Sequence, residues 1–338
     1  MTTHRVIRYI KEPDGLPDAG CFRIEDAPIP QAGEGQVLVK TRYLSIDPYM
    51  RRMMSGTRSY ANPLMVGDIM IGRGAGIVVQ SRHPDFKPGD AVQSEFGWRE
   101  HVVLDGVGLR KVAGDLDPLS LSLGIVGQSG ATAWVGLHDI GHIRSGETIV
   151  VSAAAGAVGS AVGQIARIRN CRVVGIAGGP AKCRHVVNDL GFDAAVDYKA
   201  DDFMRQLTDA LPDGVDIYFE NVGGDVLDAV ARHLNVGARI PLCGLISQYN
   251  TTQPKGFRNV GALLDKSAMI QGFRIGSHLE RRDQALAELL GWWREGKLRY
   301  HETVADGMEK APSALVNVLT GGNTGKQVVR LAQGVAGA

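Results

Sequence analysis

Residues 147–168 read ETIVVSAAAGAVGSAVGQIARI, and this stretch decides the fold. Residues 147–152 are rich in β-branched side chains and predict a buried strand. Residues 157–168 carry apolar side chains at helical spacing and predict an amphipathic helix. The turn from Ala154 to Gly159 therefore joins a strand directly to a helix, which is the setting that a dinucleotide-binding fingerprint requires.

This turn departs from the GxGxxG pattern at one position, because Ala154 stands where the first glycine belongs. Gly156 would let the backbone approach a pyrophosphate, Gly159 would let the helix pack against the strand, and the helix N-terminus would face the phosphate charge. An ordinary tight turn is the alternative, but the strand-turn-helix setting and the similar units downstream favour cofactor binding. The candidate contacts are Ala155, Gly156, Ala157, Val158 and Gly159.

Further strand-like runs follow this turn, with helical segments between them. They cover residues 171–178, 193–198, 214–222, 238–246 and 269–276, and a helix is expected before them at 129–140. Strands that alternate with helices predict a parallel sheet covered on both faces, the doubly wound α/β architecture of a Rossmann domain.

The first third of the chain has a different pattern. Short β-type runs at 36–44, 72–79, 91–96 and 98–104 are separated by turn signals and predict a compact, mostly antiparallel β domain. The change of pattern near residue 123 marks a domain boundary. A final strand-like run at 326–332 lies beyond the Rossmann series, and we interpret it as a return to the first domain.

The composition argues against several classes of protein. Charged residues make up 22% of the chain and the formal net charge is +1, so nothing favours nucleic acid or an anionic membrane surface as a partner. Residues 1–15 do not resemble a signal peptide, and no apolar run reaches membrane-spanning length. The four cysteines have no metal-binding spacing. We expect a cytoplasmic protein with a small-molecule partner and no bound metal.

The strand that ends at residue 178 indicates which dinucleotide is bound. An acidic residue there would hydrogen-bond the ribose 2′-hydroxyl of NAD, but the sequence continues Gly178-Gly179-Pro180-Ala181-Lys182. Lys182, with Arg184 as a second base, would instead neutralise the 2′-phosphate of NADPH. A solvated lysine in the first turn of a helix is the alternative, so the preference for NADPH depends equally on the missing acid.

The chain resembles the zinc-free medium-chain dehydrogenase/reductases in motifs spread along nearly its whole length. These are LSIDPYMRR (44–52), HPDFKPGD (83–90), SAAAGAVGSAVGQIA (152–166), DIYFENVGG (216–224), CGLISQYN (243–250), IQGFRIG (270–276) and GNTGKQVV (322–329). Within that family the likeness is to the prostaglandin reductase, leukotriene B4 dehydrogenase and double-bond reductase group, which includes bacterial NADPH-dependent curcumin reductase.

The resemblance implies a GroES-like catalytic domain of residues 1–123 and 308–338 and an NADP-binding Rossmann domain of residues 124–307, with the active site in the cleft between them. It also implies that the zinc ligands of related alcohol dehydrogenases are missing. Those relatives carry a cysteine and a GHE segment where this sequence reads SIDPYMRR and IGRGAG. Hydrogen-bond donors would then polarise the substrate oxygen.

Carried over from the family, most further contacts to NADPH fall on residues that follow predicted strands. They are Lys182, Tyr198, Asn221, Cys243, Gly244, Leu245, Ile246, Ser247, Tyr249, Phe273 and Asn323. Two of them have a local alternative. Asn221 lies beside Gly223 and Gly224 and would shape a turn, and Cys243 would be a small core residue, the interpretation we favour for it.

The resemblance further implies an enzyme that uses NADPH to reduce a carbon-carbon double bond conjugated to a carbonyl, as in enones, alkenals and curcumin. Charge would develop on the carbonyl oxygen, and a tyrosine hydroxyl is a neutral donor suited to it. Tyr249 is the first candidate. Tyr49 would assist it or would only pack in the pocket, and Tyr60 would line the substrate site. A homodimer is implied by the resemblance alone.

Two alternatives stay open. The chain could be a quinone oxidoreductase or a zinc-free alcohol dehydrogenase of the same superfamily, although the DPYMR and CGLISQY segments favour the enone reductase. From a different class, it could be an NADPH-binding protein without catalytic activity.

Overall fold

The computed structural model describes residues 2–55 and 64–331, and the chain divides into two compact units. Unit 1 comprises Met1–Leu123 and Glu302–Ala338, and unit 2 comprises Gly124–His301. Among the residues described, no helix is both long enough and apolar enough to cross a membrane.

Unit 2 is built on a six-stranded sheet whose neighbouring strands all run parallel. The strand order is β10-β9-β8-β11-β12-β13, so the chain starts in the middle, reaches one edge and then crosses to the other. This order confirms the doubly wound architecture predicted from the sequence. The strands are β8 (Thr148–Ser152), β9 (Arg172–Ala177), β10 (Ala194–Asp197), β11 (Val215–Phe219), β12 (Leu234–Leu242) and β13 (Met269–Gly272).

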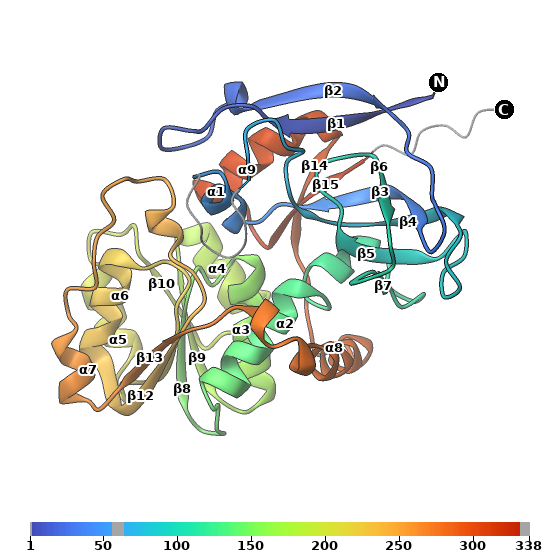
Figure 1. Ribbon diagram of the computed structural model, residues 1–338. Coiled ribbons are helices and arrows are strands. Elements are labelled where there is room, and N and C mark those ends of the chain that lie inside the picture. Colours follow the sequence, from blue (N-terminus) through green and yellow to red (C-terminus); the bar gives the residue numbers. More distant parts are fainter. Residues whose placement is uncertain (1, 56–63, 332–338) are drawn as a thin grey trace. The chain divides into compact units, whose positions relative to one another are not determined.

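Helices cover both faces of this sheet, with α2, α3, α4 and α8 on one face and α5, α6 and α7 on the other (Figure 1). Strand β8 is buried at every position, because a parallel sheet covered on both faces has no solvent side. The α-helices are α2 (Gln128–Val135), α3 (Ala157–Ile168), α4 (Pro180–Asn188), α5 (Phe203–Ala210), α6 (Gly224–Val230), α7 (Gly261–Asp265) and α8 (Leu279–Arg294). A π-helical turn, η3 (Gly136–Ile140), extends α2, and short 3-10 turns are η4 (Ala231–His233), η5 (Ile246–Gln248) and η6 (Ile275–Ser277).

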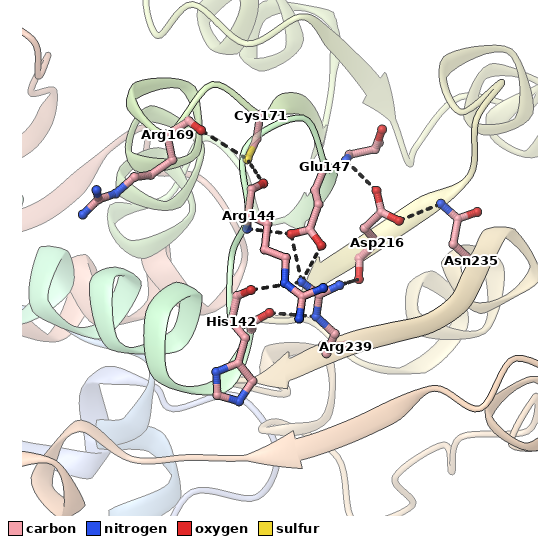
Figure 2. A network of polar contacts seen from close by, with 10 residues as sticks. His142, Arg144, Glu147, Arg169, Cys171, Asp216, Asn235 and Arg239 are labelled. Atoms are coloured by element: carbon pink, nitrogen blue, oxygen red, sulfur yellow. Dashed lines mark hydrogen bonds and ion pairs between the residues drawn. The ribbon is translucent and has the colours of Figure 1, made fainter.

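A polar network ties three strands of unit 2 together at their amino ends (Figure 2). Arg239 of β12 places Nη2 2.7 and 2.8 Å from the two carboxylate oxygens of Glu147, which precedes β8. Asp216 of β11 accepts the Thr148 N–H at 2.8 Å and Asn235 Nδ2 at 2.9 Å. Because the strands are parallel, their carboxyl ends share the opposite edge, where the loops of a ligand site are expected.

Unit 1 is mostly β-structure, as predicted. One sheet has the order β14-β15-β3-β4-β5-β7, with β6 paired to β3, and every pair is antiparallel except β14–β15. Strands β1 and β2 form a separate antiparallel pair that the sequence analysis did not foresee. The strands are β1 (Thr3–Tyr9), β2 (Phe22–Pro28), β3 (Val37–Ser45), β4 (Arg73–Ser81), β5 (Ala91–Glu95), β6 (His101–Leu104), β7 (Arg110–Lys111), β14 (Glu302–Asp306) and β15 (Lys326–Arg330).

The helices of unit 1 pack into a core shared with β1 and β15. Met50 of α1 and Leu315 of α9 are fully buried in one cluster with Ile7 and Val329. The helices are α1 (Tyr49–Met53) and α9 (Ala311–Leu319), with 3-10 turns η1 (Ala19–Cys21), η2 (Leu119–Leu123) and η7 (Met308–Lys310).

The return of the chain to unit 1 begins at residue 302, whereas the domain division drawn from the sequence kept residues 302–307 in the Rossmann domain. Strand β14 pairs in parallel with β15 over Glu302–Asp306, which attaches it to unit 1. Its sequence, ETVAD, gives three half-buried and two exposed positions, so it lacks the apolar run that reveals the other strands.

Candidate functional site

The turn after β8 prepares the N-terminus of α3 for an anionic ligand. Ala153 has φ 51°, in the left-handed region, and redirects the chain directly after the strand. Gly156 then precedes α3 as the N-cap residue, and no side chain caps this helix end. An uncapped helix N-terminus presents backbone N–H groups and a partial positive charge, which suits a phosphate.

Close packing explains the glycines of this turn. A Cβ on Gly159 would lie only 2.3 Å from the carbonyl oxygen of Ala153, so α3 can approach the turn only if residue 159 is glycine. Ala154, which replaces the first glycine of the pattern, is fully buried. A Cβ on Gly175 of β9 would lie 2.8 Å from the Cβ of Ala154. Because Gly175 on the neighbouring strand has no side chain, it leaves room for the Cβ of Ala154.

Two consecutive side chains of the loop after β10 pack against Gly178, which follows β9. A Cβ there would lie 2.8 Å from the Tyr198 ring and 3.1 Å from Lys199 Cε. Burial lowers the pKa of Lys182, and the positive charge of Lys199 lowers that pKa further. The two ammonium groups repel each other, and an anion of high charge density would relieve this repulsion.

One carboxylate lies near this cluster. Asp197 Oδ1 accepts the backbone N–H of Gly179 at 2.8 Å and that of Lys199 at 2.9 Å. Both donors belong to the backbone, so Asp197 fixes the turn before α4, the helix that carries Lys182, and the loop that carries Lys199. The sequence at the end of β9 gives no sign of this acid, because Asp197 ends the neighbouring strand β10.

Asn221 follows β11 and is attached to β8. Its backbone N–H donates to Ser152 Oγ at 2.8 Å, and its Nδ2 donates to the Ser152 carbonyl oxygen at 2.8 Å. The same Ser152 hydroxyl donates to Oε1 of Glu220 at 2.7 Å, and Glu220 is fully buried. Burial raises the pKa of Glu220. These bonds fix the position of Asn221 relative to the turn after β8.

The segment after β12 folds over the end of β11. The N–H groups of Cys243 and Gly244 donate to the Glu220 carbonyl oxygen at 2.9 and 3.2 Å. The short helix η5, Ile246–Gln248, then turns the chain back, so that Tyr249 Oη accepts the Leu245 N–H at 3.2 Å. Cys243 is half-buried, and desolvation raises the pKa of its thiol to about 12.

Phe273 follows β13 and packs against the end of α2. Its ring meets Phe219 edge-on with centroids 6.0 Å apart, and a Cβ on Gly136 would lie 2.7 Å from the Phe273 ring. The start of η3 must therefore be glycine for Phe273 to take this position.

Three predicted site residues belong to unit 1. Tyr49 begins α1, and burial together with the carboxylates of Glu95 and Asp47 raises the pKa of Tyr49 well above its usual value. Asn323 lies between α9 and β15, and its Nδ2 donates to the Gly325 carbonyl oxygen at 2.8 Å. Tyr60 lies outside the described residues.

A cavity of about 590 Å³ in unit 1 contains none of the predicted site residues. It is lined by Arg42, Tyr43, Ile77, Asp117, Leu119, Asp306, Gly307, Arg330 and Leu331. Within residues 2–55 and 64–331, no three or more His, Cys, Asp or Glu side chains gather where they could hold a metal ion.

The predicted residues of unit 2 gather at the carboxyl ends of its strands, where open α/β sheets bind ligands. The turn follows β8, Lys182 follows β9, Tyr198 follows β10, and Asn221 follows β11. Sequence reasoning missed Ser152, Lys199 and Glu220. The signal for Glu220 was an acidic residue at the end of an apolar strand, in DIYFE.

The fold and this site define a dinucleotide-dependent oxidoreductase with a β-rich second unit, and comparisons with known proteins agree. One family model, described as the N-terminal domain of oxidoreductase, matches residues 5–112, and another, described as zinc-binding dehydrogenase, matches residues 157–291. The chain belongs to the medium-chain dehydrogenase/reductase family.

Individual relatives match over nearly the full length. The chain is 46% identical over 326 residues to NADPH-dependent curcumin reductase of Escherichia coli (strain K12), covering 95% of this chain and 94% of the relative. It is 41% identical over 323 residues to prostaglandin reductase 1 of Rattus norvegicus, covering 94% and 96%. It is 41% identical over 304 residues to the NADP⁺-dependent 2-alkenal reductase of Nicotiana tabacum, covering 89% of each.

A solved structure shows the same fold. The crystal structure of CurA from Vibrio vulnificus in complex with NADPH superposes with a TM-score of 0.93 at 43% identity, covering 98% of this chain and 100% of that chain.

Proposed function

We propose that this protein reduces the carbon-carbon double bond of α,β-unsaturated aldehydes and ketones, including curcumin-type enones, with NADPH as hydride donor. The observation that carries the proposal is the full-length similarity, at 46% and 41% identity, to reductases named for curcumin and for 2-alkenals. The loops at the carboxyl edge of the sheet in unit 2 supply a matching cofactor site.

The residues of unit 2 fit the charged groups of NADPH. The uncapped N-terminus of α3 at Gly156 suits the pyrophosphate. Lys182 and Lys199 suit the 2′-phosphate, which NADH lacks, so these two lysines would discriminate between the cofactors. A side chain at residue 178 would collide with Tyr198, so the glycine keeps this loop compact.

Two tyrosines are the proposed donors to the substrate. The bound cofactor supplies the hydride that reaches the β-carbon of the substrate. As it arrives, negative charge grows on the carbonyl oxygen and needs a fixed hydrogen-bond donor. Tyr249 is held by the Leu245 N–H at 3.2 Å and is our first candidate. Tyr49 is the second. Like any tyrosine it is protonated at neutral pH, and burial raises its pKa further.

Steady-state oxidation of NADPH with a substrate panel tests this function. We expect alkenals and enones, including diarylheptanoids, to have the highest kcat/KM. A kcat/KM for quinones well above that for every enone would instead support the quinone oxidoreductase. NADPH binding without any turnover would support the non-catalytic protein. Metal analysis of the active enzyme should find no stoichiometric zinc, and activity lost with a chelator and restored by zinc would contradict the proposed donors.

We further propose a homodimer formed along β13. Among the described strands, β13 pairs only with β12, and Met269 and Gln271 are exposed on it. An open edge strand is a template for pairing with a second copy of the chain. Val260 and Leu264 are also exposed nearby in the sequence. Analytical ultracentrifugation should find a dimer. Gly272→Pro, which removes an N–H group on the side of β13 away from β12, should shift it toward monomer.

Location in the cytoplasm is part of the same proposal. All four cysteines lie in the described part of the chain and are free thiols, as expected in a reducing compartment. Cell fractionation with an antibody to the protein tests it, and recovery in a membrane or secreted fraction would contradict it.

A further inference from the structure

A fully buried carboxyl group lies beneath the proposed cofactor site. Glu220 follows β11, and its side chain is 0% exposed. Its Oε1 accepts the hydroxyl of Ser152 at 2.7 Å and also the backbone N–H of Val222. Its Oε2 is buried and makes no hydrogen bond of normal geometry among the described residues, although the Tyr218 hydroxyl lies close to the carboxyl group. Oε1 therefore accepts two hydrogen bonds, and Oε2 accepts none of normal geometry.

Through these bonds Glu220 joins three loops of the site. Ser152 leads into the turn after β8 and also accepts the Asn221 N–H at 2.8 Å. The Glu220 carbonyl oxygen accepts the N–H groups of Cys243 and Gly244 at 2.9 and 3.2 Å. A change at Glu220 therefore reaches the loops after β8, β11 and β12 together.

The groups that face Glu220 leave its charge uncompensated. The titratable ones are Tyr218 on β11 and Cys243 at the end of β12. Burial and the Glu220 carboxylate raise the pKa of both, that of Cys243 to about 12, so both are neutral at physiological pH. Ser152 on β8 does not titrate, and no lysine, arginine or histidine in the described part of the chain pairs with Glu220.

We propose that Glu220 is a positioning residue of the cofactor site and takes up one proton from solvent when NADPH binds. The inference rests on the proposed function, since it needs NADPH on these loops. An ionised Glu220 would repel the incoming phosphates, whereas a neutral Glu220 would not. The proton goes to Oε2, while Oε1 continues to accept from Ser152 and Val222.

The sign of this coupling follows from linkage. Burial already raises the pKa of Glu220, and a negatively charged ligand nearby raises it further. Between the pKa of the free protein and that of the complex, binding takes up a proton, so affinity for NADPH falls as pH rises through that interval.

Isothermal titration calorimetry of NADPH binding to the full chain, in buffers of different ionisation enthalpy, measures this uptake directly. For the wild type we expect net proton uptake between the pKa of Glu220 in the free protein and its pKa in the complex, with log Kd rising against pH there at a slope of up to about one. Glu220→Gln keeps an acceptor for Ser152 but cannot titrate, so that part of the slope should vanish. Lys182 and the cofactor phosphates titrate equally in both proteins, so the difference belongs to Glu220.

Infrared difference spectroscopy gives a second readout. Addition of NADPH to the wild type should produce the C=O stretch of a protonated carboxyl group, and Glu220→Gln should lack that band. If the Gln variant does not fold, Tyr218→Phe serves in its place. It removes a hydroxyl that lowers the pKa of Glu220, so proton uptake should move to higher pH.

Equal proton uptake by the wild type and Glu220→Gln, or a wild type without the carboxyl band, overturns the role of Glu220 and leaves the proposed function intact. A wild type that does not bind NADPH at any pH overturns the proposed function, and this inference with it.

Discussion

Lys326 Nζ lies 3.0 Å from Asp47 Oδ1, and the lysine side chain is only 1% exposed. The same ammonium donates to the carbonyl oxygens of Ile46 at 2.9 Å and Gln327 at 3.0 Å, so all three of its hydrogens are used. This buried cation fastens the last strand, β15, to the segment that leads into α1. Because Tyr49 begins α1, Lys326 holds the segment that places one of the two proposed tyrosine donors.

Lys326→Met should therefore destabilise the protein. The change leaves Asp47 without its counterion and two carbonyl groups without their donor, and breaking a buried pair in this way costs about 3–5 kcal/mol. Urea denaturation followed by circular dichroism measures the loss. Lys310→Met, at an exposed position of unit 1, is the matched control and should change stability by less than about 0.5 kcal/mol. Equal effects of the two variants would contradict this account.

Gly159→Ala should weaken both folding and NADPH binding. The new Cβ would lie 2.3 Å from the Ala153 carbonyl oxygen, so α3 must move away from the turn, and overpacking of this kind costs about 1–3 kcal/mol. Gly256→Ala is the control, because a Cβ there meets nothing within 4 Å. Thermal melting with and without NADPH checks the prediction, and a Gly159→Ala variant that melts and binds like the control would refute it.

Lys182→Ala and Lys199→Ala should each raise the KM for NADPH by about tenfold or more, because a charge-assisted bond to phosphate contributes about 1.5–3 kcal/mol. The KM for NADH should change little, since NADH lacks the 2′-phosphate. Lys297→Ala is the control, because Lys297 lies exposed after α8, where it pairs with Glu295, and it has no part in the proposed phosphate site. Equal changes for both cofactors would remove the lysines from the phosphate site.

Tyr249→Phe should lower kcat by about 10²-fold or more, as expected when an oxyanion donor is removed. The Kd for NADPH should change much less than kcat, because the ring stays and only the hydrogen bond from the Leu245 N–H to the hydroxyl is lost. Comparison with Tyr49→Phe ranks the two proposed donors. Steady-state kinetics and cofactor fluorescence measure the two quantities, and an unchanged kcat would take Tyr249 out of the mechanism.

The stability of unit 1 should fall as the solution becomes acidic. His4 and His101 have ring centroids 5.5 Å apart, and burial lowers the pKa of both. A histidine whose pKa is lower in the folded than in the unfolded chain binds fewer protons when folded, so stability is lost as pH drops below about 6.5.

His4→Asn, which keeps an acceptor for the His101 N–H, should reduce this loss. Exposed His142→Asn should leave it unchanged. Melting temperatures measured across the interval from neutral to mildly acidic pH check both expectations, and an identical pH profile for all three proteins would rule out the buried pair as the cause.

Hydrophobic patterning predicted the sheet of unit 2 because its strands are continuous apolar runs, of which β8 is fully buried. The same signal failed for β14, whose residues are half-buried or exposed. The strand-to-helix pattern also predicted the turn after β8, but it does not explain why Ala154 is tolerated there. Ala154 fits because Gly175 on β9 has no side chain, and a contact between neighbouring strands has no local pattern in the sequence.

The charged residues of the sequence identified only one of the two lysines of the proposed phosphate site. Lys182 stands out because it follows the end of a strand, whereas Lys199 belongs to a loop after β10 and becomes relevant only when that loop folds over Gly178. Glu220 was missed for a related reason. A carboxyl group among apolar residues is noticed in a sequence, but its bonds to Ser152 depend on the pairing of β11 with β8.

Strand β15 pairs with β3. The hydrogen bond from Lys326 to the Ile46 carbonyl oxygen joins residues that are 280 positions apart in the sequence. During synthesis, unit 2 therefore has all of its residues before β14, α9 and β15 have been made. The edge of β3 at residues 43–45 stays open until β15 leaves the ribosome, and an open edge is prone to mispairing. A premature stop codon that removed β15 would thus leave unit 2, the nucleotide-binding unit, complete. It would damage unit 1, although most of unit 1 is translated first.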